Sequence, residues 1–348
     1  MFVFYSILLF SFLIFVHEFG HFITAKLSGV QVNEFAIFMG PAIFKKQIGE
    51  TLYSIRLIPI GGYCAMEGED EETENPRSFR SAKWWKRLII LVSGAVMNFV
   101  VGVLLFFIVF SNYKMLDTPV LTKAEEGCTV IREDGIHIGD RLVAINGERV
   151  YVSDDFSMLM SLSDDTPDIV VERDGKKLYF DDYLMEKHRF GEESYDRYGF
   201  SFGVEENTFL NRLSYTWDYA MDMIRSVRLS LGMLFTGQAG VKDLSGPVGI
   251  VQIMSDSAAQ AQTPVAAFLT ILLFGGFLGI NLAVMNLLPI PALDGGRVVG
   301  LLLTTAVEKV TRKKINSKVE GYIHGIGMVL LLALMAVILF KDVIFLFK

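Results

Sequence analysis

The chain has 348 residues, of which 52% are hydrophobic, and a mean hydropathy of +0.42, which is too apolar for an ordinary soluble enzyme. The composition therefore predicts an α-helical membrane protein that crosses the bilayer several times. The net charge of −7 excludes a strongly basic nucleic-acid-binding protein, so no nucleic-acid partner is expected.

The first membrane helix is predicted at about residues 2–26, and polar residues lie near its end. The sequence His17-Glu18-Phe19-Gly20-His21 follows an uncharged run. Polar groups are costly in hydrocarbon, which makes a chance arrangement the weaker interpretation. Residues four apart share one helix face, so His17 and His21 can bind one ion, with Glu18 on the adjoining face as a base. This is the H-E-x-x-H pattern of zinc hydrolases, so Zn²⁺ is the expected cofactor.

A membrane-associated β-region is predicted at residues 34–66, beside the metal-binding helix. Two segments, 34–44 and 51–63, mix β-branched and aromatic residues with Gly and Pro. A protease must hold its substrate extended, and a sheet edge does so by pairing with it as an added strand. The alternative is a small capping sheet without a substrate role. The acidic run at 67–74 is interpreted as a solvated loop.

The second membrane helix is predicted at about residues 88–110. Arginines, lysines and two tryptophans, Trp84 and Trp85, precede it and indicate a boundary on the cytoplasmic side of the membrane. Asn98 is the polar exception in this helix. It is interpreted either as a helix-packing residue or as one that faces the active site.

An inserted, β-rich domain is predicted at residues 115–185. The segment from Asp134 to Val150, DGIHIGDRLVAINGERV, resembles the signature of a PDZ domain, with a Gly-Asp turn before a strand and an Asn-Gly hairpin turn. Peptide binding and steric control of access both remain open as its role. Residues 186–262 are interpreted as a linker and an amphipathic helix, at about 207–235, that lies along the outer membrane interface.

The third and fourth membrane helices are predicted at about residues 264–288 and 321–340, so the membrane core consists of 1–114 and 263–348. Pro289 and Pro291 end the third helix, and a loop then delivers Asp294 at membrane depth, which indicates a site. The basic loop after Asp294 is expected in the cytoplasm. Both termini and the PDZ-like domain are then extracytoplasmic, and the metal-binding residues lie toward the cytoplasmic side.

Five segments share the pattern of one known family, and together they cover nearly the whole chain. They are HEFGH at 17–21, SGAVMNF at 93–99, the PDZ-like segment, GPVGI at 246–250 and NLLPIPALDG at 286–295. The chain thus resembles the site-2 protease family of intramembrane zinc metalloproteases, in the bacterial subgroup with a single PDZ domain. The resemblance implies zinc bound by His17, His21 and Asp294, Glu18 as the catalytic base, and Asn286 and Asn98 as substrate-binding residues.

The resemblance also implies a function, which is regulated intramembrane proteolysis in the bacterial cytoplasmic membrane. The expected partners are the lipid bilayer and single-span membrane proteins, such as anti-sigma factors or remnant signal peptides, already cut on their outer side. Two alternatives stay open. One is a membrane metal transporter, although it has no use for Glu18 beside the ligands. The other is a membrane scaffold that binds peptides through its PDZ-like domain and has an incidental metal site.

Overall fold

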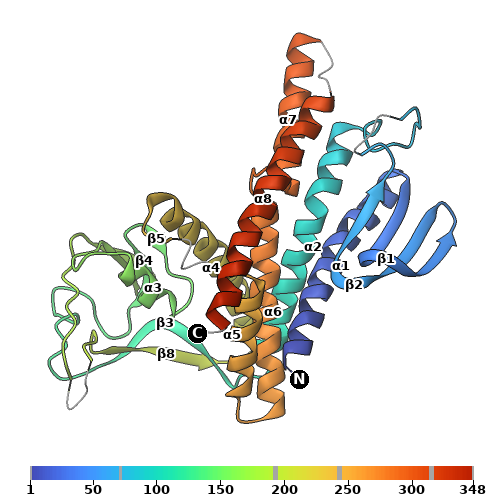
Figure 1. The fold of residues 1–348 in the computed structure, drawn as a ribbon. Coiled ribbons are helices and arrows are strands. Elements are labelled where there is room, and N and C mark those ends of the chain that lie inside the picture. The colour runs from blue at the N-terminus through green and yellow to red at the C-terminus, as the bar shows by residue number, and fades with distance from the viewer. Residues whose placement is uncertain (1, 70–72, 191–194, 241–244, 313–316, 347–348) are drawn as a thin grey trace. The chain divides into compact units, whose positions relative to one another are not determined.

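The computed structural model describes residues 2–69, 73–190, 195–240, 245–312 and 317–346 (Figure 1). Residues 70–72 of the acidic run and 313–316 of the basic segment lie outside this range. The chain forms two compact units, Met1–Leu105 with Val227–Lys348, called unit 1, and Phe106–Ser226, called unit 2. Unit 1 contains all of the expected site residues.

Four helices among the described residues are long and apolar enough to cross a membrane, as predicted. They are α1 (Phe2–Ser28), α2 (Trp84–Phe110), α6 (Pro264–Asn286) and α8 (Ser317–Leu346). The start of α6 has the cap that its sequence predicts, because the Thr263 hydroxyl accepts a hydrogen bond from the Ala266 amide at 3.1 Å. In Figure 1, α1 begins and α8 ends at the same end of this group of helices.

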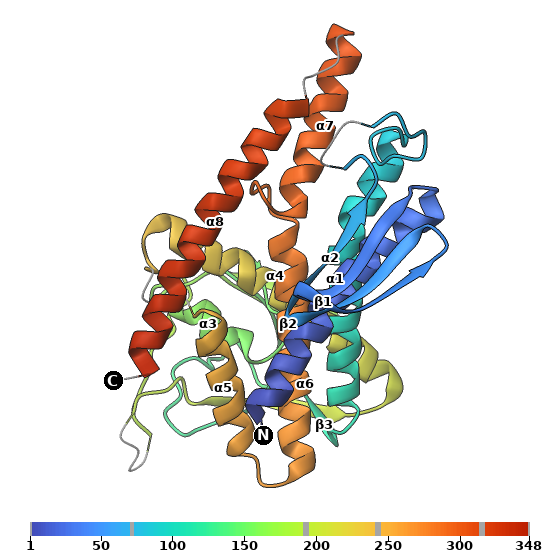
Figure 2. The same ribbon diagram turned by 45° about the vertical axis from the view of Figure 1, so that its right-hand side comes forward.

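Helix α1 is packed against two hydrophobic clusters, one on each side of the H-E-x-x-H segment. Its second half packs with β1, β2, α2 and α7 through residues such as Ala25, Phe35, Cys64, Ile90 and Leu301. Its first half packs with α2, α5 (Pro247–Ala259) and α6 through residues such as Leu9, Leu13, Leu105, Met254 and Ile271. Figure 2 shows α5 beside α1 and α6. Dense packing at both ends holds the intervening turn in place.

The β-region is a sheet of two long, bent, antiparallel strands, β1 (Val32–Ile48) and β2 (Thr51–Met66). Because of the bend, residues 34–37 of β1 pair with 52–55 of β2 on one side and with 62–65 on the other. Segment 62–66 pairs only with β1 among the described residues, so it forms an outer edge of the sheet. Such an edge presents backbone groups that can pair with another strand.

The chain after α6 differs from the prediction of a basic loop. Asp294 is the first residue of an 18-residue helix, α7 (Asp294–Thr311), and only residues 287–293 are non-helical. The prediction was wrong because the segment 298–307 has apolar residues at helical spacing, and an acidic first residue stabilises the positive end of the helix dipole. Asp294 is therefore positioned by a helix rather than by a loop.

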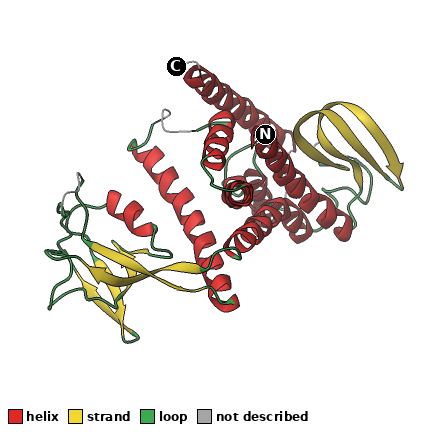
Figure 3. Ribbon diagram, turned by 90° about the horizontal axis from the view of Figure 1, so that it is seen from below, coloured by secondary structure: helices red, strands yellow, loops and turns green. Residues whose placement is uncertain are grey.

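Unit 2 contains a six-stranded sheet together with α3 (Asp155–Ser161) and the first part of α4 (Phe209–Thr236) (Figure 3). The strand order is β7-β6-β4-β3-β8, and β5 pairs with β4. The strands are β3 (Met115–Ala124), β4 (Arg141–Ile145), β5 (Glu148–Arg149), β6 (Ile169–Arg173), β7 (Lys176–Phe180) and β8 (Phe200–Glu206). The Asn-Gly turn predicted from the sequence joins β4 to β5, with positive φ at both Asn146 and Gly147.

Strand β8 lies in the segment that the sequence indicated as a linker. It pairs with β3 from Met115 to Ala124, so the sheet domain extends to Glu206 rather than ending at residue 185. The pairing joins residues about 80 positions apart, and local sequence patterns do not indicate such long-range partners.

Asp140 has a structural role in the Gly-Asp turn of this domain. Its carboxylate is almost fully buried and accepts hydrogen bonds from Arg173 at 2.6 and 2.7 Å and from the His137 amide at 2.8 Å. Burial raises the pKa of Asp140, but the Arg173 and His137 donors outweigh it and hold this pKa below its usual range. The turn is therefore fixed by a charged pair inside the domain.

Candidate metal centre and active site

Helix α1 brings the two histidines of the H-E-x-x-H segment together. The spacing of four residues places His17 and His21 on one helix face, with their Nε2 atoms 3.2 Å apart. His21 is buried and His17 is partly buried. Both Nε2 atoms are therefore available to a single ion.

The first residue of α7 completes the group. The Asp294 Oδ2 atom lies 3.1 Å from His17 Nε2 and 3.3 Å from His21 Nε2. Zinc holds nitrogen and oxygen ligands at about 2.0–2.2 Å in a tetrahedron, which separates neighbouring ligand atoms by about 3.3 Å. The three atoms thus have the spacing of three corners of a zinc tetrahedron, and a zinc ion bound by them would have its fourth corner left for water or a substrate.

The hydrogen bonds around the site determine which atoms of His21 and Asp294 are available to bind a metal. His21 donates from Nδ1 to the carbonyl oxygen of Ile90 at 2.8 Å, because a carbonyl can only accept. The His21 Nε2 atom therefore presents a lone pair, as a metal ligand must. Among the described residues, Asp294 Oδ2 is buried without a hydrogen-bond partner. A buried carboxylate oxygen facing nitrogen lone pairs is costly unless a cation lies between them, and the site therefore fits a divalent metal.

Asn98 of α2 contacts the other histidine. It is 1% exposed, and its amide nitrogen lies 3.5 Å from His17 Nδ1, while its buried Oδ1 has no partner among the described residues. A half-turn of the amide exchanges these two atoms and lets Oδ1 accept the Nδ1–H of His17. That arrangement would match the bond between His21 and Ile90. The role of Asn98 as a substrate-binding residue stays a prediction.

Glu18 lies beside the edge segment of β2. A Cβ atom built on Gly62 would be 3.5 Å from Glu18 Cγ, so strand and carboxylate side chain approach closely. Glu18 is partly buried. The position of the proposed base thus adjoins the sheet edge at 62–66.

Two glycines allow α1 and α2 to approach each other at the site. A Cβ on Gly20 would lie 2.5 Å from the Ser93 carbonyl oxygen, and Gly94 lies against the imidazoles of His17 and His21. Thr24 and Ser93 join the two helices through a 2.8 Å hydroxyl contact. Gly20 lies in the segment HEFGH and Gly94 in SGAVMNF, so these two motifs could have indicated the close approach of the helices. No sequence pattern indicates the role of the Ile90 carbonyl, because every residue type has a backbone carbonyl.

Asn286 is the remaining residue that the resemblance singled out. It is the last residue of α6, partly buried, and residues 287–293 connect it to Asp294. Among the described residues, the group whose spacing could hold a metal ion consists of His17, His21 and Asp294. A substrate-binding role for Asn286 stays a prediction.

Comparison with known proteins gives matches over nearly the whole chain. A model of peptidase family M50 matches residues 5–334, which include all three ligand positions. A Clostridium perfringens protein whose name assigns it as a zinc metalloprotease is 34% identical over 99% of each chain. The zinc metalloprotease RasP of Bacillus licheniformis is 30% identical, and the regulator of sigma-W protease RasP of Bacillus subtilis is 27% identical, each over 97% of both chains.

Proposed function

Since the chain belongs to peptidase family M50, the site-2 proteases, and is an intramembrane zinc metalloprotease, we propose that it cuts single-span membrane proteins within or next to their transmembrane segments. The observation that supports this most strongly is the position of Glu18. It adjoins both a three-ligand group with zinc spacing and a free sheet edge. A metal-activated water, a base and an extended peptide can therefore meet at one point.

The ligands and the base have distinct roles in this proposal. When bound, zinc supplies a Lewis acid that polarises the scissile carbonyl and lowers the pKa of water to about 7. His17, His21 and Asp294 would hold this metal. Glu18 accepts a proton from the attacking water and returns it to the amine that leaves, so the peptide C–N bond breaks while Glu18 is regenerated.

Segment 62–66 of β2 is the proposed binding edge for the substrate. A transmembrane helix protects its peptide bonds with internal hydrogen bonds, and pairing with a strand edge holds the chain extended instead. Gly62 has no side chain, so the backbone of this edge segment can lie close to Glu18. The edge favours this role over that of a capping sheet.

The proposed substrates follow from the relatives and from the implied topology. One relative is named as a regulator of sigma-W protease, which supports anti-sigma factors as a substrate class, alongside remnant signal peptides. We propose a location in the bacterial cytoplasmic membrane, with both termini outside and the active site toward the cytoplasm. The basic residues next to the apolar helices support this orientation.

The β-domain of unit 2 is proposed as a PDZ-like filter that admits substrates already shortened on the outer side. Phe156 of α3 packs edge to face against Tyr198, Phe200 and Phe202, with ring centroids 5.0–5.6 Å apart. These contacts pack α3 against β8 and the segment before it, which supports a domain of fixed shape that acts by its bulk. Helix α4 is proposed to lie along the membrane interface.

The test uses a single-span substrate in proteoliposomes. Glu18→Gln should retain one zinc per chain and lose cleavage by about 10²-fold or more, because the base is removed and the ligands remain. Glu126→Gln, at an exposed position of unit 2, is the matched control and should cleave at the wild-type rate. Wild-type rates in Glu18→Gln would remove the proposed base. Zinc transport without cleavage would favour the transporter, and zinc-independent substrate binding without cleavage would favour the scaffold.

A further inference from the structure

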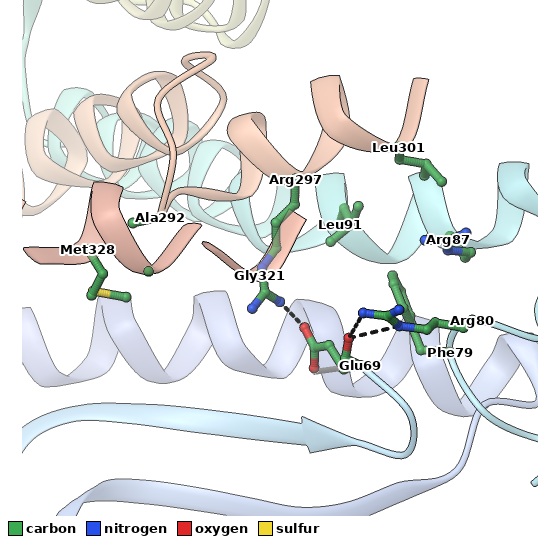
Figure 4. A pocket seen from close by; sticks show the side chains of 11 residues that line it. Glu69, Phe79, Arg80, Arg87, Leu91, Ala292, Arg297, Leu301, Gly321 and Met328 are labelled. Atoms are coloured by element: carbon green, nitrogen blue, oxygen red, sulfur yellow. Dashed lines mark hydrogen bonds and ion pairs between the residues drawn. The ribbon is translucent and has the colours of Figure 1, made fainter. Parts of the chain in front are cut away.

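A pocket lined by arginines lies in unit 1, beside the segments that hold the metal ligands. Its volume is about 440 Å³, and residues of α2, α7, α8 and the segment after β2 line it (Figure 4). Among the described residues that line the pocket, Arg80, Arg87 and Arg297 supply the cations, and Glu69 supplies the one carboxylate. This described part of the lining has an excess of positive charge, and guanidinium groups are well suited to binding phosphate.

The arginines are held at the pocket by contacts with its own lining. Arg297 forms an ion pair with Glu69, and Arg80 donates to the Glu69 carbonyl oxygen at 3.4 Å, as Figure 4 shows. The Arg87 guanidinium lies 5.1 Å from the centre of the Phe79 ring. Glu69 is therefore not the solvated loop residue that its acidic run suggested. These contacts keep the cations in place before any ligand binds.

The pocket shares two lining residues with an apolar groove on α8. The groove has a volume of about 330 Å³ and is lined by Gly321, Tyr322, Gly325, Ile326, Val329 and Leu330. Gly321 and Gly325 belong to both cavities. A ligand that fits both has an anionic head and an apolar chain.

The height of the pocket along the helices matches a lipid headgroup. The apolar span of α8 begins at Gly321, and the span of α2 begins at Trp84, three residues before Arg87. Trp84 and Trp85 are exposed, as interfacial aromatic residues are. Basic pockets between membrane helices at such an interface bind anionic lipid headgroups.

We propose that this pocket binds an anionic phospholipid, with the phosphate at Arg80, Arg87 and Arg297 and an acyl chain along the α8 groove. The lipid would also act on the protease, a step that rests on the proposed function. Leu91 in the lining follows Ile90, whose carbonyl holds His21, and Arg297 lies one helical turn after Asp294. Bound lipid would therefore stabilise both backbone segments that position ligands.

Lipid retention measured by native mass spectrometry tests the binding without relying on cleavage. The full chain carrying Glu18→Gln is equilibrated with vesicles of phosphatidylglycerol or phosphatidylcholine and then purified. We expect phosphatidylglycerol to be retained about tenfold or more over phosphatidylcholine, and Arg80→Gln with Arg87→Gln to abolish that preference. Lys45→Gln with Lys46→Gln, at exposed positions of β1, is the matched control and should leave it unchanged.

A second variant keeps the test informative if loss of the arginines prevents folding. A Cβ atom built on Gly325 meets no atom within 4 Å, so we expect Gly325→Leu to fold and to fill the junction of the two cavities. It should lower phosphatidylglycerol retention and leave binding of glycerol 1-phosphate unchanged. Equal retention of both lipids by the starting protein would overturn the proposal. So would a site that binds glycerol 1-phosphate or an acidic peptide as tightly as it binds phosphatidylglycerol. If the proposed protease function is wrong, the measured retention of phosphatidylglycerol is unaffected, because this experiment does not depend on cleavage.

Discussion

Gly94 lies directly against the imidazole of His21, such that a Cβ atom at this position would be 2.4 Å from Nε2. The same atom would be 2.7 Å from Cε1 of His17. Side-chain carbons do not approach other atoms this closely, so only glycine fits between α2 and the two rings. The bare backbone of α2 at Gly94 is what lets both Nε2 atoms turn toward Asp294.

The first prediction is that Gly94→Ala weakens zinc binding. The added methyl must displace one or both imidazoles, and misplaced ligands lower metal affinity, here by about tenfold or more. Gly232→Ala, where a Cβ meets no atom within 4 Å, is the control and should bind zinc normally. Zinc affinity is measured by competition with a chelator. Unchanged affinity in Gly94→Ala would mean that the site does not require this close approach.

The second prediction concerns the third ligand. Asp294→Ala should purify with much less than one zinc per chain, because two imidazoles alone leave the tetrahedron half empty. Cleavage should fall with it. Asp256→Ala, at an exposed position on α5, should retain full zinc content. Elemental analysis of the purified proteins checks this, and full zinc content in Asp294→Ala would assign the third ligand to another residue.

The third prediction separates two roles for Asn98. If its amide oxygen accepts the Nδ1–H of His17, Asn98→Leu should weaken zinc binding by about 10–100-fold, as loss of such outer partners does. Asn98→Asp, which retains an acceptor oxygen, should restore most of that affinity. If Asn98 instead binds substrate, as the resemblance implies, Asn98→Leu should raise KM and leave zinc affinity unchanged.

The part of the site that depends on local spacing could be predicted from the sequence. His17, Glu18 and His21 lie within five residues of one helix, and Pro289 and Pro291 end α6 shortly before Asp294. Regular helical geometry converts both patterns into positions. The four apolar helices could also be predicted from the sequence, because each is a continuous apolar run.

The parts that depend on distant pairing could not be predicted. Strand β8 joins its sheet through β3, and segment 62–66 becomes a sheet edge only because β2 bends around β1. The start of α7 at Asp294 was missed because two prolines and two glycines surround it and suggest a loop. In each case tertiary contacts override the local pattern.

A buried charged group in unit 2 leads to the fourth prediction. Arg225 of α4 lies between two carboxylates, 2.7 Å from Asp155 of α3 and in direct contact with Asp222 of α4. Asp155 and Asp222 are 3% and 5% exposed. Burial, the hydrogen bond with Asp155 and the charge of Asp155 raise the pKa of Asp222 to about 7, although Arg225 opposes the shift. One guanidinium does not balance two buried negative charges.

This raised pKa predicts that the contact between α3 and α4 weakens as pH rises. The pKa of an unfolded aspartate is about 3.9, so between about pH 4 and 7 the folded chain binds more protons than the unfolded one, and its stability falls. Asp222→Asn, which stays neutral, should flatten this dependence. Hydrogen exchange of the α3 amides, corrected for the intrinsic effect of pH, should therefore differ more between the variant and wild type at pH 8 than at pH 5.

Asp164→Asn is the matched control, because Asp164 is exposed and lies in the same unit just beyond the end of α3. It should follow wild type at every pH. If Asp222→Asn instead loses protection at pH 5 and pH 8 alike, the carboxylate of Asp222 acts as a permanent partner of Arg225, and its proton has no role in joining α3 to α4. A constant difference of this kind would show that the ion pair outweighs the repulsion between the two aspartates.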